Sequence, residues 1–302
     1  MNLITTQSDE KMAASATGVK LALPLSVVVA ARNEEKNLPR CLLSLAGVGE
    51  IYVIDSHSTD NTASVARRYN AKIVQFDYKG GWPKKRQWAL DTLPLAYEWV
   101  LLLDADEALT PELTAEIHDA IRNPNVDGFY VTLQMHFLGR PLRQCGAQFY
   151  KLVLFRRGKG HYECRLRSQD ASMCDMEVHE HVVVEGATRK LKNPIVHHNV
   201  ESLERYIEKH NQYSNWESAV IARGTLASEL PPTLFGNQAQ RRRWLRKQFF
   251  VVPGSPVALF LYRYIFRLGF LDGVPGLIYC AFQAIQMFHV KAKLYELKTT
   301  RE

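Results

Sequence analysis

Short apolar runs alternate with segments of helical spacing between residues 26 and 103, and this alternation limits the fold more than any other feature of the sequence. Short apolar runs are typical of buried strands, whereas leucines three and four positions apart indicate helices. The alternation predicts a parallel, doubly wound α/β sheet. The predicted strands are residues 26–30, 51–54, 72–76 and 99–103, and the predicted helices are residues 34–45, 62–69 and 85–92.

The sequence beyond this region changes character twice. It becomes β-like and irregular after a predicted helix that begins with a proline, and a second, longer helix follows. The pair Pro231-Pro232 then marks a boundary in composition. The helices are expected over 111–122 and 201–222, and the β-like segments over 128–155 and 182–184. We expect three units: a flexible tail (1–22), an α/β domain (23–228) and a helical extension (229–302).

An acidic pair follows the fourth predicted strand, where Asp104 and Asp106 flank Ala105. In an open α/β sheet, ligands bind beyond the carboxyl ends of the strands. Residues two apart in extended chain point to the same side, so both carboxylates can face one site. Carboxylate oxygens suit Mg²⁺ or Mn²⁺, which also accept phosphate oxygens. Such a triplet is weak evidence for a metal site by itself, because acidic loops are common. Its placement after a strand favours a metal and nucleotide site.

The second predicted strand also ends in an acid, Asp55. A carboxylate there can accept a hydrogen bond from a base N–H or a ribose hydroxyl. The polar series 56–62 then opens a helix whose N–H groups favour anions. Helix capping explains Asp60 without any ligand, but it does not explain Asp55.

Polar residues after the first strand complete the edge. Ala31, Arg32 and Glu34 lie in this segment, so three strand ends make a crevice of nucleotide size. The basic run 84–86, which contains Lys85, follows two glycines and is placed to supply cations for a diphosphate. An isolated basic run is more often a solvated face, and this alternative stays open.

The segment 175–181 combines acids with two histidines and leads into a β-like run. The spacing of a zinc-protease motif is absent, so Glu177 and Glu180 are candidates for a general base. Further along, His197 and His198 follow another apolar run. One of these imidazoles can complete the coordination shell of a metal ion; a structural histidine is equally compatible.

These motifs, taken in order, resemble a bacterial family-2 glycosyltransferase of the branch that adds sugars to lipopolysaccharide core or exopolysaccharide. The resemblance covers about residues 24–222 and continues more weakly through 263–297. It implies a GT-A fold, which is a mixed sheet flanked by helices. It also implies a UDP-sugar donor, a divalent metal (Mn²⁺ or Mg²⁺), inversion at the anomeric carbon, and transfer of a hexose to a hydroxyl of a lipid-linked saccharide. The segments that carry it are ARNEE, DSHSTDNT, KKRQWAL, WVLLLDADE, MEVHEH, PIVHH and KHNQYSNWE.

By position, the resemblance makes Asp55 the acid that contacts the nucleoside base and Asp106 the direct metal ligand. Ser56 departs from the family, because most members have a second acid there. The pattern and the resemblance together assign nucleotide-sugar binding to Ala31, Arg32, Glu34, Asp55, Lys85, Asp104 and Ala105, metal binding to Asp106 and His197, and the role of catalytic base to Glu180.

The positive charge of the chain is concentrated at its end. Residues 241–302 hold 11 lysine and arginine residues against 3 acidic ones, although the net charge of the whole chain is only +7. A nearly neutral body with a cationic end argues against nucleic-acid binding and for an anionic membrane surface. The apolar stretches 248–262 and 273–290 are poor membrane spans, so we expect interfacial helices. Packing onto the α/β domain or onto a second copy is the alternative.

Five scattered cysteines without metal spacing indicate reduced thiols in a cytoplasmic protein. The reduced cysteines and the cationic segment 241–302 together predict a peripheral or monotopic protein at the cytoplasmic face of a bacterial inner membrane. A homo-oligomer is compatible with the sequence.

Two other functions use similar residues. A non-catalytic nucleotide-sugar-binding or membrane scaffold protein would need the binding groups without Glu180. A phosphatase of the haloacid dehalogenase type places its acidic pair after the first strand, with Thr or Val two residues later, whereas Ala108 is found here.

Overall fold

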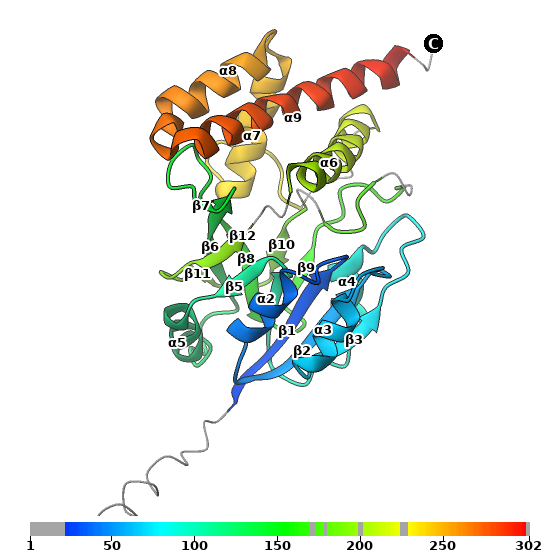
Figure 1. Cartoon of the computed structure of the whole chain (residues 1–302), viewed down its shortest axis with the longest axis vertical. Coiled ribbons are helices and arrows are strands. Elements are labelled where there is room, and N and C mark those ends of the chain that lie inside the picture. Colours follow the sequence, from blue (N-terminus) through cyan, green and yellow to red (C-terminus); the bar gives the residue numbers. More distant parts are fainter. Residues whose placement is uncertain (1–21, 170–172, 178–179, 199–201, 224–228, 300–302) are drawn as a thin grey trace, which may run out of the picture.

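The strands predicted between residues 26 and 103 form one side of a larger sheet in the computed structural model, which describes residues 22–169, 173–177, 180–198, 202–223 and 229–299 (Figure 1). These strands are β1 (Leu23–Ala31), β2 (Val48–Asp55), β3 (Lys72–Gln75) and β4 (Trp99–Asp104). The other strands of the sheet are β5 (Glu107–Leu109), β6 (Gly128–Phe137), β7 (Arg140–Pro141), β8 (Phe149–Arg156), β11 (Thr188–Lys190) and β12 (Ile195–His198).

The sheet is mixed, and the parallel arrangement predicted from the alternation applies to one side of it. Its order is β3-β2-β1-β4-β8-β6-β12-β5, with β7 and β11 paired to β6. The side β3-β2-β1-β4 is parallel, as predicted, but β8 is antiparallel to both β4 and β6. Parallel neighbours in a sheet need a crossover connection, usually a helix. No helix lies between β6, β7 and β8, so these consecutive strands pair antiparallel. The mixed sheet confirms the fold class that the resemblance implies.

Helices cover both faces of the parallel side. They are α2 (Leu38–Ser44), α3 (Thr62–Arg68), α4 (Lys85–Thr92) and α5 (Pro111–Ala120). Successive residues of β1 alternate between the two faces: Val27 belongs to the same core as Leu42 of α2 and Ile117 of α5, whereas Val28 packs with Ala89 of α4. Apart from the buried Ser26, the run is apolar because both faces are buried.

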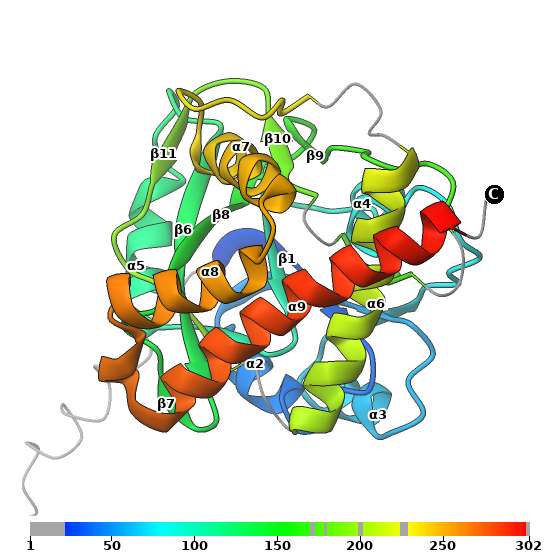
Figure 2. The same cartoon turned by 90° about the horizontal axis from the view of Figure 1, so that it is seen from above.

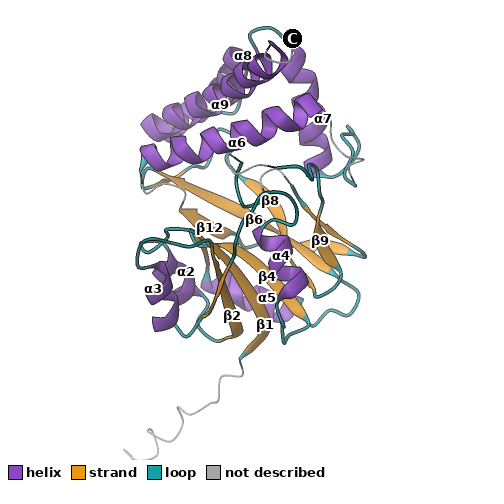
Figure 3. Cartoon of the chain, turned by 90° about the vertical axis from the view of Figure 1, so that its right-hand side faces the viewer, coloured by secondary structure: helices purple, strands orange, loops and turns teal. Residues whose placement is uncertain are grey.

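The remaining helices form a layer over the end of the sheet at which β1 and β4 finish (Figures 1 and 3). They are α6 (Leu203–Arg223), α7 (Gln238–Val251), α8 (Ser255–Leu261), a π-helical turn η1 (Tyr262–Phe266), a 3₁₀ turn η2 (Gly269–Asp272) and α9 (Gly273–Thr299). Helix α9 packs across α6 (Figure 2), and Tyr279 of α9 shares a core with Tyr206 of α6 and Phe137 of β6. A separate two-stranded antiparallel sheet pairs β9 (Gly160–Tyr162) with β10 (Val182–Val184). The division at residue 228 stays a prediction.

The length and hydropathy of the C-terminal helices bear on whether they can cross a membrane. Within the described ranges, no single helix is both long and apolar enough to cross a bilayer. The segments Ser255–Phe266 and Gly269–Thr299 satisfy both conditions together, but they are bent by 72° where they meet.

Candidate active site

The polar residues that follow β1, β2 and β4 meet at one edge of the sheet. In the parallel ladders, Ala31 lies opposite Asp55, and Ala30 lies opposite Asp104. The backbone N–H of Ala105 donates to the carbonyl oxygen of Ala30 at 3.2 Å, so the turn after β4 is tied to β1. The structure therefore brings together the strand ends from which the sequence predicts a nucleotide site.

Asp55 is held in one orientation at this edge. It is 1% exposed, and its carboxylate accepts hydrogen bonds from Nε2 of Gln75 at 3.0 Å and from the backbone N–H of Ser58 at 3.3 Å. Gln75 ends the neighbouring strand β3, and Ser58 lies in the loop before α3. A carboxylate fixed from two sides is suited to a directional contact such as that with a nucleoside base.

Two cations surround Asp104, the last residue of β4. Its carboxylate forms an ion pair with Arg86 and a second one with Lys151, whose Nζ lies 3.6 Å from Oδ2. Burial opposes the charge, but Arg86 and Lys151 outweigh it and hold the pKa of Asp104 well below its usual range. Asp104 is therefore ionised at any physiological pH.

Asp106 occupies the turn between β4 and β5, and its carboxylate faces His197. Antiparallel pairing of β12 with β5 places His197 opposite Glu107, which brings Nε2 of His197 to 3.3 Å from Oδ2 of Asp106. Burial opposes ionisation of both groups, but their mutual attraction lowers the pKa of Asp106 and raises that of His197. The strand pairing thus joins two groups that are distant in the sequence.

The other histidine of the pair points away from Asp106, as alternation along a strand requires. The ring of His198 lies 4.7 Å from that of His136, centroid to centroid. Burial, with the nearby charge of Arg40, lowers the pKa of His198 to about 4. Of the two histidines that the sequence leaves open, His197 is the one beside the acidic turn.

Asp106 and His197 fit a divalent cation that shares its ligands with a nucleotide. Among the described residues, no group of three or more His, Cys, Asp or Glu side chains is arranged to hold a metal ion. A nucleotide-bound Mg²⁺ or Mn²⁺ needs fewer, because phosphates and water fill most of its positions. Nε2 of His197 and Oδ2 of Asp106 lie 3.3 Å apart, so a cation bound at this point would contact both side chains.

The basic run at the start of α4 is buried. Its three side chains are at most 8% exposed, so the interpretation as a solvated face is wrong. Nζ of Lys85 also donates to the carbonyl oxygen of Ala31 at 2.9 Å, which places it against the end of β1. Contact of Lys85 with a diphosphate stays a prediction. The run forms ion pairs between Lys84 and Glu180 (3.1 Å), Lys85 and Asp175 (3.1 Å), and Arg86 and Glu177 (3.5 Å).

The structure separates the two candidates for a general base. Glu177 caps α4, because its carboxylate accepts from the backbone N–H groups of Arg86 at 3.3 Å and Gln87 at 2.9 Å. Burial raises the pKa of Glu180 to about 7, against the opposing effect of Lys84. A carboxyl group that titrates near neutral pH is suited to accept a proton, so the geometry favours Glu180.

Two basic residues of α6, neither of which is among the predicted site residues, reach the loop after β1. Nη2 of Arg205 lies 2.9 Å and Nζ of Lys209 lies 3.4 Å from Oε1 of Glu34. Burial, with the charge of Asp106, raises the pKa of Glu34, although Lys209 opposes the change. Arg205 also donates to the carbonyl oxygen of Arg32 at 2.7 Å. The four-residue spacing of the two cations on a predicted helix was the available signal, because it puts them on one face.

Residues 26–182 match the family described as glycosyl transferase family 2, and this match spans just over half of the 302 residues. The chain therefore belongs to this family, and it is a glycosyltransferase with a GT-A fold. It is 29% identical over 292 residues to the lipopolysaccharide core biosynthesis glycosyltransferase LpsC of Rhizobium meliloti, covering 91% of this chain and 93% of that one. It is 25% identical over 284 residues to an uncharacterized glycosyltransferase of Rickettsia typhi, covering 90% and 87%.

Solved structures with a related arrangement are more distant. TarS residues 1–349 of S. aureus match with a TM-score of 0.40 and 18% identity, covering 91% of each chain. Glucosyl-3-phosphoglycerate synthase of Mycobacterium tuberculosis, crystallised with Mg²⁺ and UDP, matches with a TM-score of 0.37 and 16% identity, covering 72% of this chain and 85% of that one.

Proposed function

We propose that this glycosyltransferase moves a hexose from a UDP-sugar to a hydroxyl of a lipid-linked saccharide in the synthesis of lipopolysaccharide core or exopolysaccharide. The similarity to LpsC, which extends over nearly all of both chains, supports this choice of pathway. The observation that carries the proposal is the clustering of Asp55, Asp104 and Asp106 at one edge of the sheet, with His197 beside the acidic turn.

The chemistry assigns separate tasks to these residues. Ionised Glu180 accepts the proton of the acceptor hydroxyl while that oxygen attacks the anomeric carbon. The bond from this carbon to the UDP oxygen breaks on the opposite face of the ring, and a single displacement inverts the configuration. A divalent cation, Mn²⁺ or Mg²⁺, held by Asp106 and His197 would supply positive charge for the departing diphosphate. Asp55 orients the base of the nucleotide.

The same proposal includes attachment to the cytoplasmic face of a bacterial inner membrane, peripheral or monotopic, through residues 241–302. The helical layer exposes large apolar side chains, including Phe266 at 76%, Val274 at 67% and Leu271 at 61%. Apolar side chains beside a cationic segment are typical of helices that lie in the headgroup region of anionic leaflets.

The first test is stabilisation by donor and metal together. UDP-sugar at 100 times its Kd in the presence of Mn²⁺ should add about 2.7 kcal/mol to the free energy of unfolding, because only the folded chain binds it. The melting temperature should then rise by about 5 °C for a chain of this size. The measurement is a thermal scan over a panel of UDP-sugars, with Mn²⁺ alone and with donor plus chelator as controls. Equal stabilisation in excess chelator would contradict the metal assignment.

The raised pKa of Glu180 determines the expected pH dependence of the reaction. Because its pKa is raised from 4.5 to about 7, the group carries its proton below that pH and cannot act as a base. We expect kcat/KM to fall about tenfold per pH unit below pH 7 and to level off above it. The profile is measured at fixed metal and donor concentrations. Residual activity of Glu180→Gln should lack this acidic limb; a limb that persists would assign the titration to another group.

A further inference from the structure

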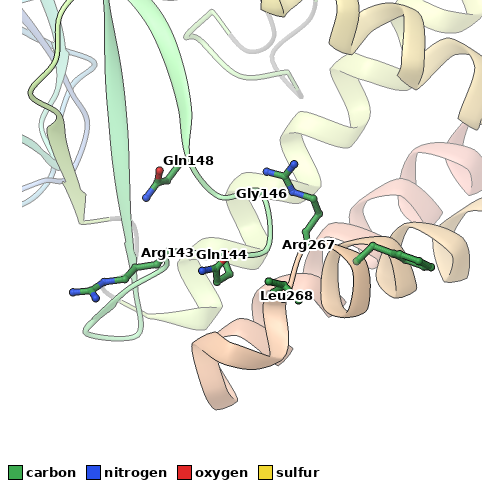
Figure 4. A pocket seen from close by; sticks show the side chains of 7 residues that line it. Arg143, Gln144, Gly146, Gln148, Arg267 and Leu268 are labelled. Atoms are coloured by element: carbon green, nitrogen blue, oxygen red, sulfur yellow. The ribbon is translucent and has the colours of Figure 1, made fainter.

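A pocket of about 280 Å³ lies outside the donor site, between the loop that joins β7 to β8 and the corner where η1 meets η2 (Figure 4). None of the residues assigned above to sugar transfer lines it. Its walls are mostly polar or cationic. They include Arg143, Gln144 and Gln148 from the loop, and Phe266, Arg267 and Leu268 from the corner.

The guanidinium groups of Arg263 and Arg267 meet at the Gly146 side of this pocket, whereas the side chain of Arg143, which also lines it, points away from Arg267 (Figure 4). A methyl group placed on Gly146 would lie 3.6 Å from Nη1 of Arg263 and 3.7 Å from Nε of Arg267, so both arginines meet at the same point of the loop. Nη1 of Arg263 donates to the carbonyl oxygen of Cys145 at 2.9 Å, which fixes this side chain. Loss of surrounding water, with the charges of Arg263 and Arg267, lowers the pKa of Arg242 on the adjacent α7.

The protein does not balance this charge at close range. Within the described ranges, Arg143, Arg263 and Arg267 form no ion pair with a carboxylate. The acid nearest to the loop is Asp272, whose oxygens accept from the backbone N–H groups of Arg143 at 3.0 Å and Gln144 at 2.9 Å. Several guanidinium groups around one pocket with a single acid beside them create a site for an oxyanion, and guanidinium matches phosphate through paired hydrogen bonds.

The rim of the pocket is apolar, which favours the phosphate group of a lipid over a free phosphate ion as the ligand. Phe266 in the wall is 76% exposed, and Leu268, Phe270 and Leu271 follow at the same corner with 42%, 47% and 61% exposure. A free phosphate ion would gain nothing from such a rim. A lipid phosphate would, because its acyl chains lie next to its anionic group.

We propose that this pocket binds the phosphate group of an anionic membrane lipid, with Arg267 as the donor, Arg263 beside it, and the η1–η2 corner in contact with the acyl chains. The inference rests on the membrane attachment proposed above and adds a defined headgroup site to it. It predicts recognition of phosphate, beyond a general attraction to negative surfaces.

The test measures binding of the full chain to uncharged galactolipid vesicles that carry either phosphatidylglycerol or tetraphenylborate, a lipid-soluble anion without a hydrogen-bond acceptor, at matched surface potential. The wild-type protein should prefer the phosphate vesicles about tenfold, since charge-assisted hydrogen bonds contribute at least 1.4 kcal/mol, or roughly a factor of ten. The variant Arg267→Gln should lose this preference. The control Lys247→Gln removes the same charge from α7 and should keep the preference, even if binding to both vesicles weakens.

Each other result counts against the pocket. Loss of the preference in both variants would indicate general electrostatics. A wild-type preference that survives in the pocket variant would move the headgroup site elsewhere. Thermal stabilisation by inorganic phosphate without any vesicle preference would assign the pocket to a soluble anion. Failure to bind either vesicle would overturn membrane attachment as well, whereas sugar transfer in detergent tests the catalytic proposal separately.

Discussion

Replacement of Glu180 by glutamine is expected to lower kcat by about 10²–10⁴ and to leave the affinity for UDP-sugar unchanged. The amide keeps the size of the side chain and an oxygen that can accept from Lys84, but it cannot take the proton of the acceptor hydroxyl. Glu180 forms its ion pair with Lys84, which precedes α4, whereas the acids proposed to bind the nucleotide follow β2 and β4. Steady-state transfer assays and donor titrations measure the two quantities.

Glu185→Gln is the matched control, because Glu185 is an exposed carboxylate in the same part of the chain. Its kcat should equal that of the wild type. Thermal melting of Glu180→Gln must be followed alongside, because the buried ammonium of Lys84 then faces a neutral group. A folded Glu180→Gln with normal turnover would remove Glu180 from the role of base.

The second large effect is expected for Asp106→Asn. This change removes the carboxylate that faces His197, and we expect kcat to fall by about 10²–10³, the range measured when one stabilising group is lost from a site of developing negative charge. It should also weaken Mn²⁺ binding in the presence of UDP. Mn²⁺ binding is followed by electron paramagnetic resonance, which needs no turnover.

Asp119→Asn on α5 is the control for loss of an acidic group, because the side chain of Asp119 is 80% exposed. It should bind Mn²⁺ with UDP as the wild type does. Unchanged Mn²⁺ affinity in Asp106→Asn, or full transfer by the wild type in excess chelator, would refute the proposed metal site.

Local patterns in the sequence were sufficient for much of the fold. The predicted helix 85–92 has the same limits as α4, and the four strands between 26 and 103 lie within three residues of their predicted limits. The insertion of β8 between β4 and β6 was not predictable in this way, because strand order depends on contacts between distant segments.

The same distinction applies to the candidate site. Strand ends identified the acids at the edge, since their position depends on the local alternation. The role of Glu177 as a cap for α4 was hidden, because its partners at 86 and 87 are about ninety positions away. Lys151 could not be predicted either: it reaches Asp104 because β8 runs beside β4, and nothing in the local sequence of β8 marks that lysine.

Helix α6 contacts both the edge of the sheet that carries the candidate site and the C-terminal helices. Arg205 near its start contacts Glu34, and Glu217 near its end forms an ion pair with Arg246 of α7 at 2.6 Å. Nζ of Lys293 in α9 donates a hydrogen bond to Oγ of Ser214, in the middle of α6, at 2.7 Å. With the proposed membrane attachment, a tilt of the C-terminal helices on a bilayer would move α6 and shift Arg205 and Lys209 relative to Glu34. Lipid contact would then change the affinity for the proposed sugar donor.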